Sequence, residues 1–421
     1  MTHFFVDDDT LERALTTKTA LNYFHVFDAF LSSNNQNFNN LVDSLIVEYI
    51  QSKQPIKFQK IKYKRTLNIL LSNLLYCHQT SAKLYLVISR TSGWYSSDKR
   101  YNPMGLNATV ICNLVDWLEE KNYIIQFKGT KFGNNTSRTR IRSKKTLIDV
   151  YKKMNVLSAL IISPLREVII LKDVEKKPQT YSDNKETNRM RVCVERLNAL
   201  LKKTKLELNS SQLPTQHLHR VFNDGSFKLG GRFYGGSYQN LPKTDRKNLL
   251  VNGSPVTELD FSTIHPNILY SKVKQAMPND PYLPINYPLN ARDFLKLFFL
   301  IILNSANENQ AIQAGLILAS KKHRGLGYNT KLAIKAVLQD LKMHNRQIQK
   351  YFCKCEAKRL MYIDSKIAES VITRFVKLKI PIYPVHDSFI VPVAHGALLK
   401  QAMIASYQHE VGSTIRVDKV Y

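Results

Sequence analysis

Two apolar, strand-like segments lie far apart in the chain, and each carries an aspartate where a strand ends or turns. Asp260 belongs to the run ELDFSTIHP at 258–266, and Asp387 belongs to IYPVHDSFIV at 382–391. Carboxylates from a strand end and a hairpin turn can converge on hard cations. Two magnesium ions held in this way stabilise the attacking and leaving oxygens of an in-line phosphoryl displacement. The pair therefore predicts nucleotidyl transfer, with both aspartates as catalytic metal ligands.

A helix with one basic stripe is predicted between these two segments. Arg292, Lys296, Leu300 and Asn304 recur every four residues, and this spacing puts them on one helical face. Apolar residues at the other positions would pack the helix onto its neighbours. We expect Arg292 and Lys296 to hold a triphosphate, while Asn304 faces the sugar or the base.

Taken in order, the Asp260 strand, the basic helix and the His-Asp hairpin resemble the family A polymerases. This is the group of DNA polymerase I and the phage and mitochondrial single-subunit polymerases. The resemblance covers roughly residues 215 to 421. It implies an α+β right-hand polymerase fold, with a palm of antiparallel sheet plus helices and with helical fingers. It also implies two Mg²⁺ ions at the aspartates, with Mn²⁺ as a substitute, and a nucleic-acid contact at His386.

The chain departs from that family where the sugar is selected. Leu300 and Asn304 stand where the family DNA polymerases carry aromatic residues, and His265 replaces the glutamate that helps to reject a ribose 2′-OH. We expect His265 to lie against the nucleotide, and the choice between dNTPs and rNTPs stays open. Ser388 occupies a position that is usually acidic. Glu258 shares a strand face with Asp260 and is a weaker candidate for a further carboxylate near the metals.

The charge balance predicts a polyanionic partner. Sixty-one Lys and Arg residues against thirty-three Asp and Glu residues give a formal net charge of +28. Such an excess favours phosphate contacts that release counterions, so we expect template–primer DNA as the partner. No basic-then-apolar signal opens the chain, no apolar run is long enough to cross a bilayer, and five cysteines form no paired framework. We expect a cytoplasmic protein without a membrane partner, working at a nucleoid or phage replication site.

A winged-helix-like module is predicted in the first half of the chain. A helix over 107–118, a strand at 121–125 and a basic hairpin at 128–142 follow one another. In a winged helix, the helix faces a nucleic-acid groove and the hairpin lies along the phosphate backbone. The predicted backbone contacts are Lys128, Lys131, Arg138, Arg140 and Arg142. The alternative is a protein-interaction winged helix whose charges are solvated.

A glycine-rich basic segment at 220–236 precedes the first aspartate strand. Its glycines permit a close backbone approach, and Arg232 lies next to aromatic residues that offer stacking surface. We predict that Arg232 and Arg246 contact template or primer. The alternative is a β-hairpin with an ordinary half-buried aromatic pair.

These patterns divide the chain into six regions. They are an N-terminal helical region (1–65), the winged-helix-like module (66–153), a linker with a thumb-like helix (154–215), an N-terminal palm segment (216–285), fingers (286–356) and a C-terminal palm segment (357–421). The predicted function is a template-directed nucleotidyl polymerase, most simply a DNA-directed DNA polymerase without proofreading, suited to a phage or mobile element. A primase or single-subunit RNA polymerase is the first alternative. An inactive DNA-binding replication initiator or regulator is the second.

Overall fold

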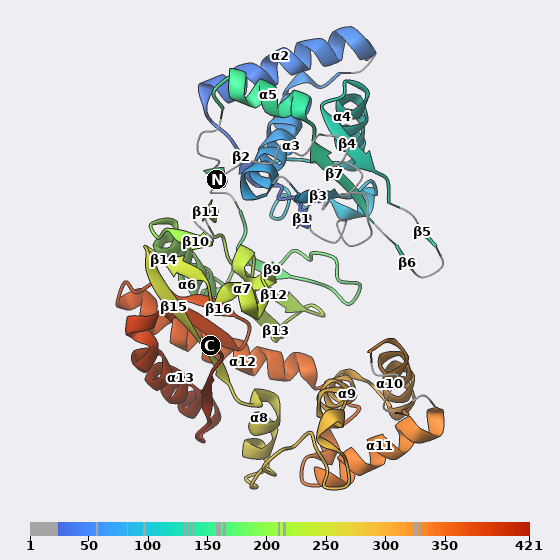
Figure 1. Ribbon diagram of the computed structural model, residues 1–421, viewed down its shortest axis with the longest axis vertical. Helices are drawn as coiled ribbons and strands as arrows, with labels where there is room; N and C mark the ends of the chain where they lie inside the picture. The colour runs from blue at the N-terminus through green and yellow to red at the C-terminus, as the bar shows by residue number, and fades with distance from the viewer. Residues whose placement is uncertain are drawn as a thin grey trace, which may run out of the picture. The chain divides into compact units, whose positions relative to one another are not determined.

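The chain forms two compact units in the computed structural model, Met1–Glu167 (unit 1) and Val168–Tyr421 (unit 2), and both are drawn in Figure 1. The structure describes residues 24–55, 58–81, 83–95, 98–129, 131–132, 135–136, 138–156, 161–162, 166–208, 211–213, 216–322, 327–328 and 330–421.

In its described residues, unit 1 packs four helices against a small sheet. The helices are α2 (Gln36–Lys53), α3 (Lys60–Thr80), α4 (Ala108–Glu120) and α5 (Lys145–Lys153). The sheet order is β1-β3-β7-β4, with bounds Phe24–Val26, Tyr85–Ile88, Thr139–Ser143 and Ile124–Phe127. Strand β2 (Leu31–Ser32) pairs with β8 (Ile161–Ile162), and β5 (Lys131–Phe132) pairs with β6 (Asn135–Thr136). The predicted order of helix, strand and extended hairpin is therefore present in α4, β4 and the β5–β6 pair.

Local signals in the sequence account for the helices of unit 1. Asn107 caps α4 by accepting a hydrogen bond from the backbone N–H of Val110, the standard use of Asn before a helix. The boundary predicted between residues 65 and 66 falls inside α3. Tyr63 and Leu67 lie on opposite sides of that point and bury their side chains in the same core, so the chain has no domain boundary there.

Unit 2 contains two sheets in the part that the structure describes. The larger one has the order β11-β10-β14-β15-β17-β16, with β18 added beside β15, and every pairing in it is antiparallel. The strand bounds in this order are Ser211–Gln212, Leu206–Leu208, Leu249–Val251, Ser254–Phe261, Ser388–Pro392, Tyr383–Val385 and, for β18, Val417–Lys419. The smaller sheet has the order β13-β12-β9, with bounds Ser226–Tyr234, His219–Asn223 and Ile169–Leu171.

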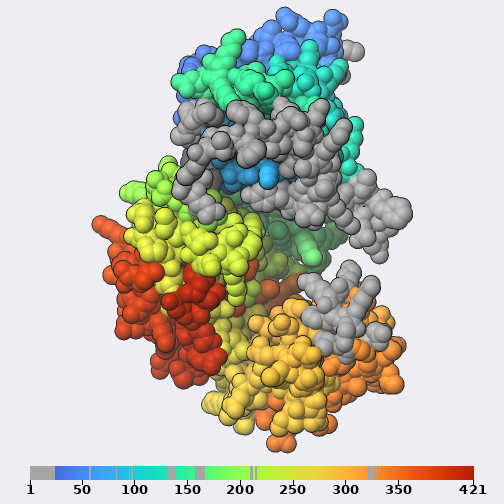
Figure 2. Space-filling view, in the orientation of Figure 1, coloured from blue at the N-terminus to red at the C-terminus, as the bar shows by residue number. Residues whose placement is uncertain are grey.

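The helices of unit 2 enclose one hydrophobic core with these sheets. They are α6 (Lys185–Lys202), α7 (Lys243–Arg246), α8 (Ile264–Lys272), α9 (Arg292–Asn304), α10 (Glu308–Lys322), α11 (Lys331–His344), α12 (Ala357–Lys377) and α13 (Gly396–Val411). Helix α12 packs on β13, α13 and α6. The helix predicted as thumb-like, α6, buries Met190, Val194 and Leu197 in this core. In the space-filling view, the dark red C-terminal segment lies next to the yellow surface of the unit (Figure 2).

The predicted α+β class is confirmed at the level of an antiparallel sheet combined with helices. The run predicted as the basic helix is helix α9, from Arg292 to Asn304. Across the described ranges, no helix combines the length and the apolar character that a membrane span requires.

Candidate active site

The two predicted metal ligands lie at neighbouring positions in the larger sheet of unit 2. Asp260 is the penultimate residue of β15, and Asp387 lies in the turn between β16 and β17. Asp260 pairs in register with Ser388, the residue after Asp387. The backbone N–H of Phe261 lies 3.4 Å from the carbonyl oxygen of Asp387, to which it donates. Segments distant in sequence therefore bring both aspartates to the same end of two adjacent interior strands.

The turn that carries Asp387 has an unusual backbone. His386 adopts a φ of 59°, a left-handed conformation that only a few per cent of non-glycine residues adopt, although histidine, asparagine and aspartate do so more often than the rest. Its ring packs edge-on against Tyr234, with 5.5 Å between centroids, and its Nδ1 atom is buried without a hydrogen-bond partner in the described part of the chain. Burial lowers the pKa of His386, and nearby Arg232 lowers it further. Left-handed backbone of this kind concentrates at functional sites.

The carboxyl group of Asp260 is poised to gain from a cation. Burial, and then the charge of Asp387, raise its pKa to about 7, while Lys243 and Lys296 act in the opposite direction. Its Oδ1 atom is buried, and none of the described residues forms a hydrogen bond to it. A divalent cation between Asp260 and Asp387 would satisfy that oxygen and offset the repulsion between the two carboxylates, so the residues present fit a metal ion.

Glu258 lies on the same strand, but both oxygens of its carboxylate already accept hydrogen bonds. Arg246 donates two hydrogen bonds of 2.8 Å to its carboxylate, and the Ser388 hydroxyl donates a third of 2.7 Å. The side chains of Glu258 and Arg246 are both buried. Arg246 also donates to the carbonyl oxygen of Leu241. Its predicted contact with nucleic acid is therefore disfavoured, and its observed role is to neutralise Glu258 behind the aspartates.

Arg232 and His265 meet at a third carboxylate, which the sequence patterns did not single out. Asp364 of α12 accepts hydrogen bonds from the guanidinium of Arg232, and the Nε2 atom of His265 lies 2.9 Å from its Oδ2. All three side chains are largely buried. Burial opposes the charged form of Arg232, but Asp364 outweighs it and raises the pKa of Arg232. The negative charge of Asp387 also raises the pKa of Arg232. This cluster therefore lies near the two aspartates.

The basic stripe of α9 lies over a buried tyrosine that the sequence patterns also missed. Arg292 and Lys296 approach the ring of Tyr282, at 5.6 and 5.8 Å from its centroid. Burial raises the pKa of Tyr282, and its hydroxyl also senses Asp387 and Asp260. Helix α9 therefore presents its two cations to the region of the aspartates. Tyr282 lies outside the predicted fingers run, which is why no helical spacing pointed to it.

The other polar residues of this stripe are differently engaged. Arg292 forms an ion pair with Asp280, whose carboxylate also accepts a 3.0 Å hydrogen bond from the backbone of Tyr282. Asn304 is the last residue of α9 and donates to the carbonyl oxygen of Leu300. Lys296 is exposed, and no hydrogen bond or ion pair to another described residue occupies its ammonium group.

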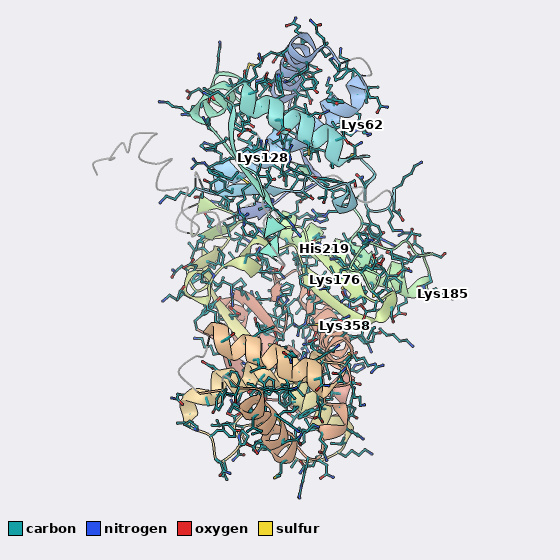
Figure 3. The ribbon with its side chains drawn as sticks, turned by 90° about the vertical axis from the view of Figure 1, so that its right-hand side faces the viewer. Lys62, Lys128, Lys176, Lys185, His219 and Lys358 are labelled. Atoms are coloured by element: carbon teal, nitrogen blue, oxygen red, sulfur yellow. The ribbon has the colours of Figure 1, made fainter. Side chains whose placement is uncertain are left out.

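The predicted backbone-binding residues of unit 1 fall into distinct environments. Lys128 follows β4 and is exposed; it is labelled in Figure 3. The side chain of Lys131 lies outside the described residues. Arg138, Arg140 and Arg142 alternate along β7 and the residue before it. Arg140 lies 5.3 Å from the ring centroid of Phe24, and Arg142 is buried over Tyr85 at 5.4 Å.

Helix α4, predicted to face a nucleic-acid groove, contains no lysine or arginine. Its partly exposed residues include Asp116 and Glu119, and Asp116 forms an ion pair with Arg90. By contrast, the first turns of α3 carry Lys60, Lys62, Lys64 and Arg65. Lys62 is labelled in Figure 3. The basic character of unit 1 is therefore concentrated on the hairpin and α3, and the protein-interaction alternative stays open for α4.

Within the described ranges, no group of three or more His, Cys, Asp and Glu side chains has an arrangement suited to a metal ion. The site at Asp260 and Asp387 offers two carboxylates, so the remaining ligands would come from main-chain oxygens, water or a bound phosphate.

Comparison of the chain with protein-family models and with curated proteins finds no match.

Proposed function

We propose that this chain is a template-directed nucleotidyl polymerase, most simply a DNA-directed DNA polymerase without proofreading. The observation that carries the proposal is the meeting of Asp260 and Asp387 at the same end of two adjacent strands. There, burial and mutual repulsion raise the pKa of Asp260 to about 7. Two carboxylates brought together in this way make a site that gains from divalent metal.

Each residue of the site has a role under this proposal. Asp260 and Asp387 would hold Mg²⁺, which when bound supplies charge stabilisation at the reacting phosphate oxygens. Lys296, whose ammonium group pairs with no described carboxylate, would bind the triphosphate, and Arg292 would join it after leaving Asp280. Helix α9 lies between the two aspartate segments in the sequence and belongs to the same compact unit. Its cations therefore come from the unit that holds the carboxylates, which supports these roles.

Primer extension tests the proposal directly. Asp260→Asn and Asp387→Asn should each abolish nucleotide addition, because the change removes a metal ligand while preserving side-chain size. Binding of a labelled primer–template duplex should stay close to that of the unmodified protein. Glu195→Gln, which changes an exposed carboxylate on α6, is the matched control and should extend primers normally. Extension at the unmodified rate by either aspartate variant would refute the metal-ligand assignment.

A primase or single-subunit RNA polymerase is the second candidate, and His265 is the observation that favours it. A histidine held by Asp364 is bulky, but it lacks the fixed negative charge of a glutamate opposite a ribose hydroxyl. We expect dNTPs to be preferred with a modest margin, and His265→Ala to raise rNTP incorporation relative to dNTP incorporation. Competition assays with and without a primer measure both properties. An rNTP preference in the unmodified protein, or synthesis without a primer, would replace the DNA polymerase proposal with this one.

The remaining alternative is a DNA-binding replication initiator or regulator without catalysis. The same assays separate it from both polymerases. Tight binding of duplex DNA together with no nucleotide addition from any nucleotide, in Mg²⁺ or Mn²⁺, would favour the initiator.

A further inference from the structure

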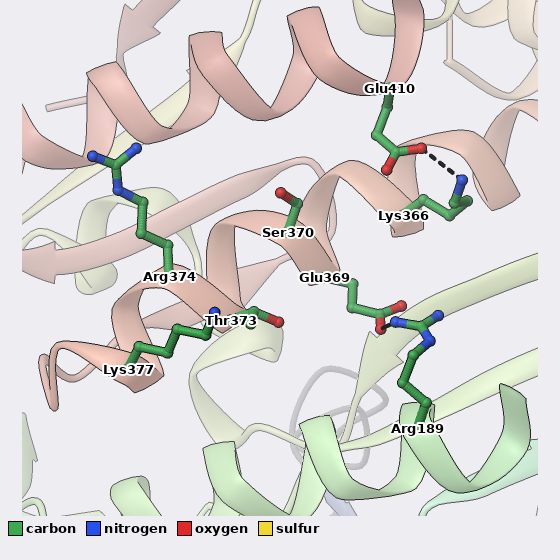
Figure 4. A pocket seen from close by; sticks show the side chains of 8 residues that line it. All are labelled: Arg189, Lys366, Glu369, Ser370, Thr373, Arg374, Lys377 and Glu410. Carbon is green, nitrogen blue, oxygen red and sulfur yellow. Dashed lines mark hydrogen bonds and ion pairs between the residues drawn. The ribbon is translucent and has the colours of Figure 1, made fainter. Parts of the chain in front are cut away.

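A polar groove of about 420 Å³ lies between α6, α12 and α13 of unit 2. Figure 4 shows its side chains arranged along one side of α12, with Arg189 reaching in from α6 and Glu410 from α13. The lining residues are Arg189, Lys366, Glu369, Ser370, Thr373, Arg374, Lys377 and Glu410. Four of them are cations and two are carboxylates, so the groove carries a net positive charge.

Both carboxylates of the groove are already neutralised. Glu369 is buried and accepts hydrogen bonds from Arg189 and from Arg220, the latter at 2.6 Å. Glu410 forms a 2.6 Å ion pair with Lys366. The acidic groups therefore organise one end of the groove and leave little negative charge to repel an anion.

The other end of the groove carries cations that have no such partner. Arg374 and Lys377 are exposed, and neither forms an ion pair or side-chain hydrogen bond with another described residue. They lie one helical turn apart on α12, next to the hydroxyl groups of Ser370 and Thr373. Ser370 accepts a 3.0 Å hydrogen bond from the hydroxyl of Ser406 of α13. The Thr373 hydroxyl lies 3.5 Å from the sulfur of Cys193, so the two cations are the donors at this end without a described acceptor.

This groove is separate from the candidate active site. With about 3.6 residues per helical turn, Ser370, Thr373 and Lys377 share one side of α12. Asp364 points from the opposite side, where it holds Arg232 and His265. The groove therefore lies across the helix from the aspartates and has no part in the roles given to them above.

We propose that the groove between α6, α12 and α13 binds phosphate groups of a nucleic-acid strand outside the catalytic centre. Phosphate oxygens accept hydrogen bonds from arginine, lysine and hydroxyl groups, the donors found together here. A strand is favoured over an acidic peptide because serine and threonine hydroxyls beside cations are typical of backbone contacts with nucleic acid. The choice of nucleic acid as the source of phosphate rests on the proposed function, whereas the anion site itself does not.

The salt dependence of DNA binding tests this proposal. Each lost phosphate contact on duplex DNA should reduce the slope of log K against log salt by about 0.9, so the double variant Arg374→Ala/Lys377→Ala should lose about 1.8. Anisotropy of a labelled duplex, between about 50 and 200 mM salt, measures the slope. Lys335→Ala/Lys400→Ala removes the same charge from exposed positions outside the groove. Equal slopes for the two double variants would overturn the proposal.

Further arms distinguish the sources of the anion. Calorimetric titration with inorganic phosphate and with a dNTP asks whether the groove takes free anions. Suppose that Arg374→Ala/Lys377→Ala loses binding of inorganic phosphate or of the dNTP, while the salt slope of DNA binding is unchanged. This result would overturn the nucleic-acid assignment in favour of a free phosphate compound. Loss of binding to a polyglutamate peptide, again with an unchanged DNA slope, would overturn it in favour of an acidic protein partner.

The result stays separable from the polymerase proposal. All DNA-binding measurements are repeated in the Asp260→Asn background, in which nucleotide addition is expected to be absent. A reduced slope in that background supports the groove even if the unmodified protein fails to extend primers. Primer extension with an unchanged slope would support the polymerase and refute the groove.

Discussion

The hydroxyl of Ser388 donates a 2.7 Å hydrogen bond to the carboxylate of Glu258, directly behind the pair of aspartates. This contact gives the Ser388 hydroxyl a charged, buried acceptor. A carboxylate at position 388 would face Glu258, which is buried and already matched by Arg246. Arg246 therefore neutralises the charge of Glu258, and Ser388 adds a hydrogen bond between the two strands that carry the site.

Removing the Ser388 hydroxyl should destabilise unit 2. Ser388→Ala leaves one oxygen of Glu258 with fewer donors, and loss of a hydrogen bond to a charged group costs about 1.5 kcal/mol. Ser388→Asp should cost more, about 3 kcal/mol, because it buries a second negative charge beside Glu258. Urea unfolding of the two variants measures the free energies. A Ser388→Asp variant as stable as the unmodified protein would contradict this account.

The Asp260 carboxyl should make folding and cation binding depend on pH. Its pKa is about 7 in the folded protein, against the ordinary value of 3.8. Between these values the folded protein binds a proton that the unfolded chain has released, so stability falls as pH rises through this window. Mg²⁺ binds the ionised form, so its affinity should increase up to about pH 7 and level off above it.

Thermal unfolding with Mg²⁺ and with a chelator, across this pH range, checks both halves of this prediction. The gain in Tm from Mg²⁺ should be larger at about pH 8 than at about pH 6. Asp260→Asn should abolish the pH dependence of that gain. A gain that is the same at both pH values would show that the Asp260 carboxyl does not control cation binding.

Asp280 should compete with the nucleotide for Arg292. The two side chains form an ion pair at the start of α9, and Arg292 is partly exposed. Asp280→Asn should therefore lower KM for the nucleotide by up to about fivefold, since exposed ion pairs contribute up to about 1 kcal/mol. Asp293→Asn, at an exposed position in the first turn of α9, is the control. A KM that rises in Asp280→Asn would indicate that Asp280 positions Arg292 instead.

The arginines of strand β7 should separate into binding and structural residues. Arg138 is exposed and Arg140 half-buried, so Arg138→Ala/Arg140→Ala should reduce the salt slope of DNA binding by about 0.9 for each phosphate contact that is lost. Arg142 is buried over Tyr85, and Arg142→Ala should instead lower stability by about 1 kcal/mol. An unchanged salt slope in the double variant would favour the protein-interaction alternative for unit 1.

The sequence was most informative where a local repeat determines the geometry. Strand alternation and turn chemistry predicted that Asp260 and Asp387 sit at strand ends, and the four-residue spacing predicted α9 from Arg292 onward. These features depend on neighbouring residues alone. Their meeting was inferred from the pairing of the two segments and from the family resemblance. No local rule determines it, because the register between β15 and β17 is a long-range property.

The fate of individual arginines could not be predicted in the same way. Arg232 and Arg246 belong to the surplus of positive charge, yet each is held by a buried carboxylate, Asp364 or Glu258. Composition counts charges but does not say which cation faces which anion after folding. Tyr282 was missed for a related reason: the segment before α9 has no periodic pattern, and its position under the basic stripe depends on tertiary packing.

Helix α12 connects the groove with the Asp364 cluster, because it contributes side chains to both. One side of α12 carries Asp364, which holds Arg232 and His265, and the opposite side carries Thr373 and Lys377 of the groove. A ligand that displaces this helix from the groove side changes the geometry at Asp364 as well. If such a ligand changes the affinity for the nucleotide by some factor, the nucleotide must change the affinity for the ligand by the same factor. The two faces of a single rigid element would thus report on each other's occupancy.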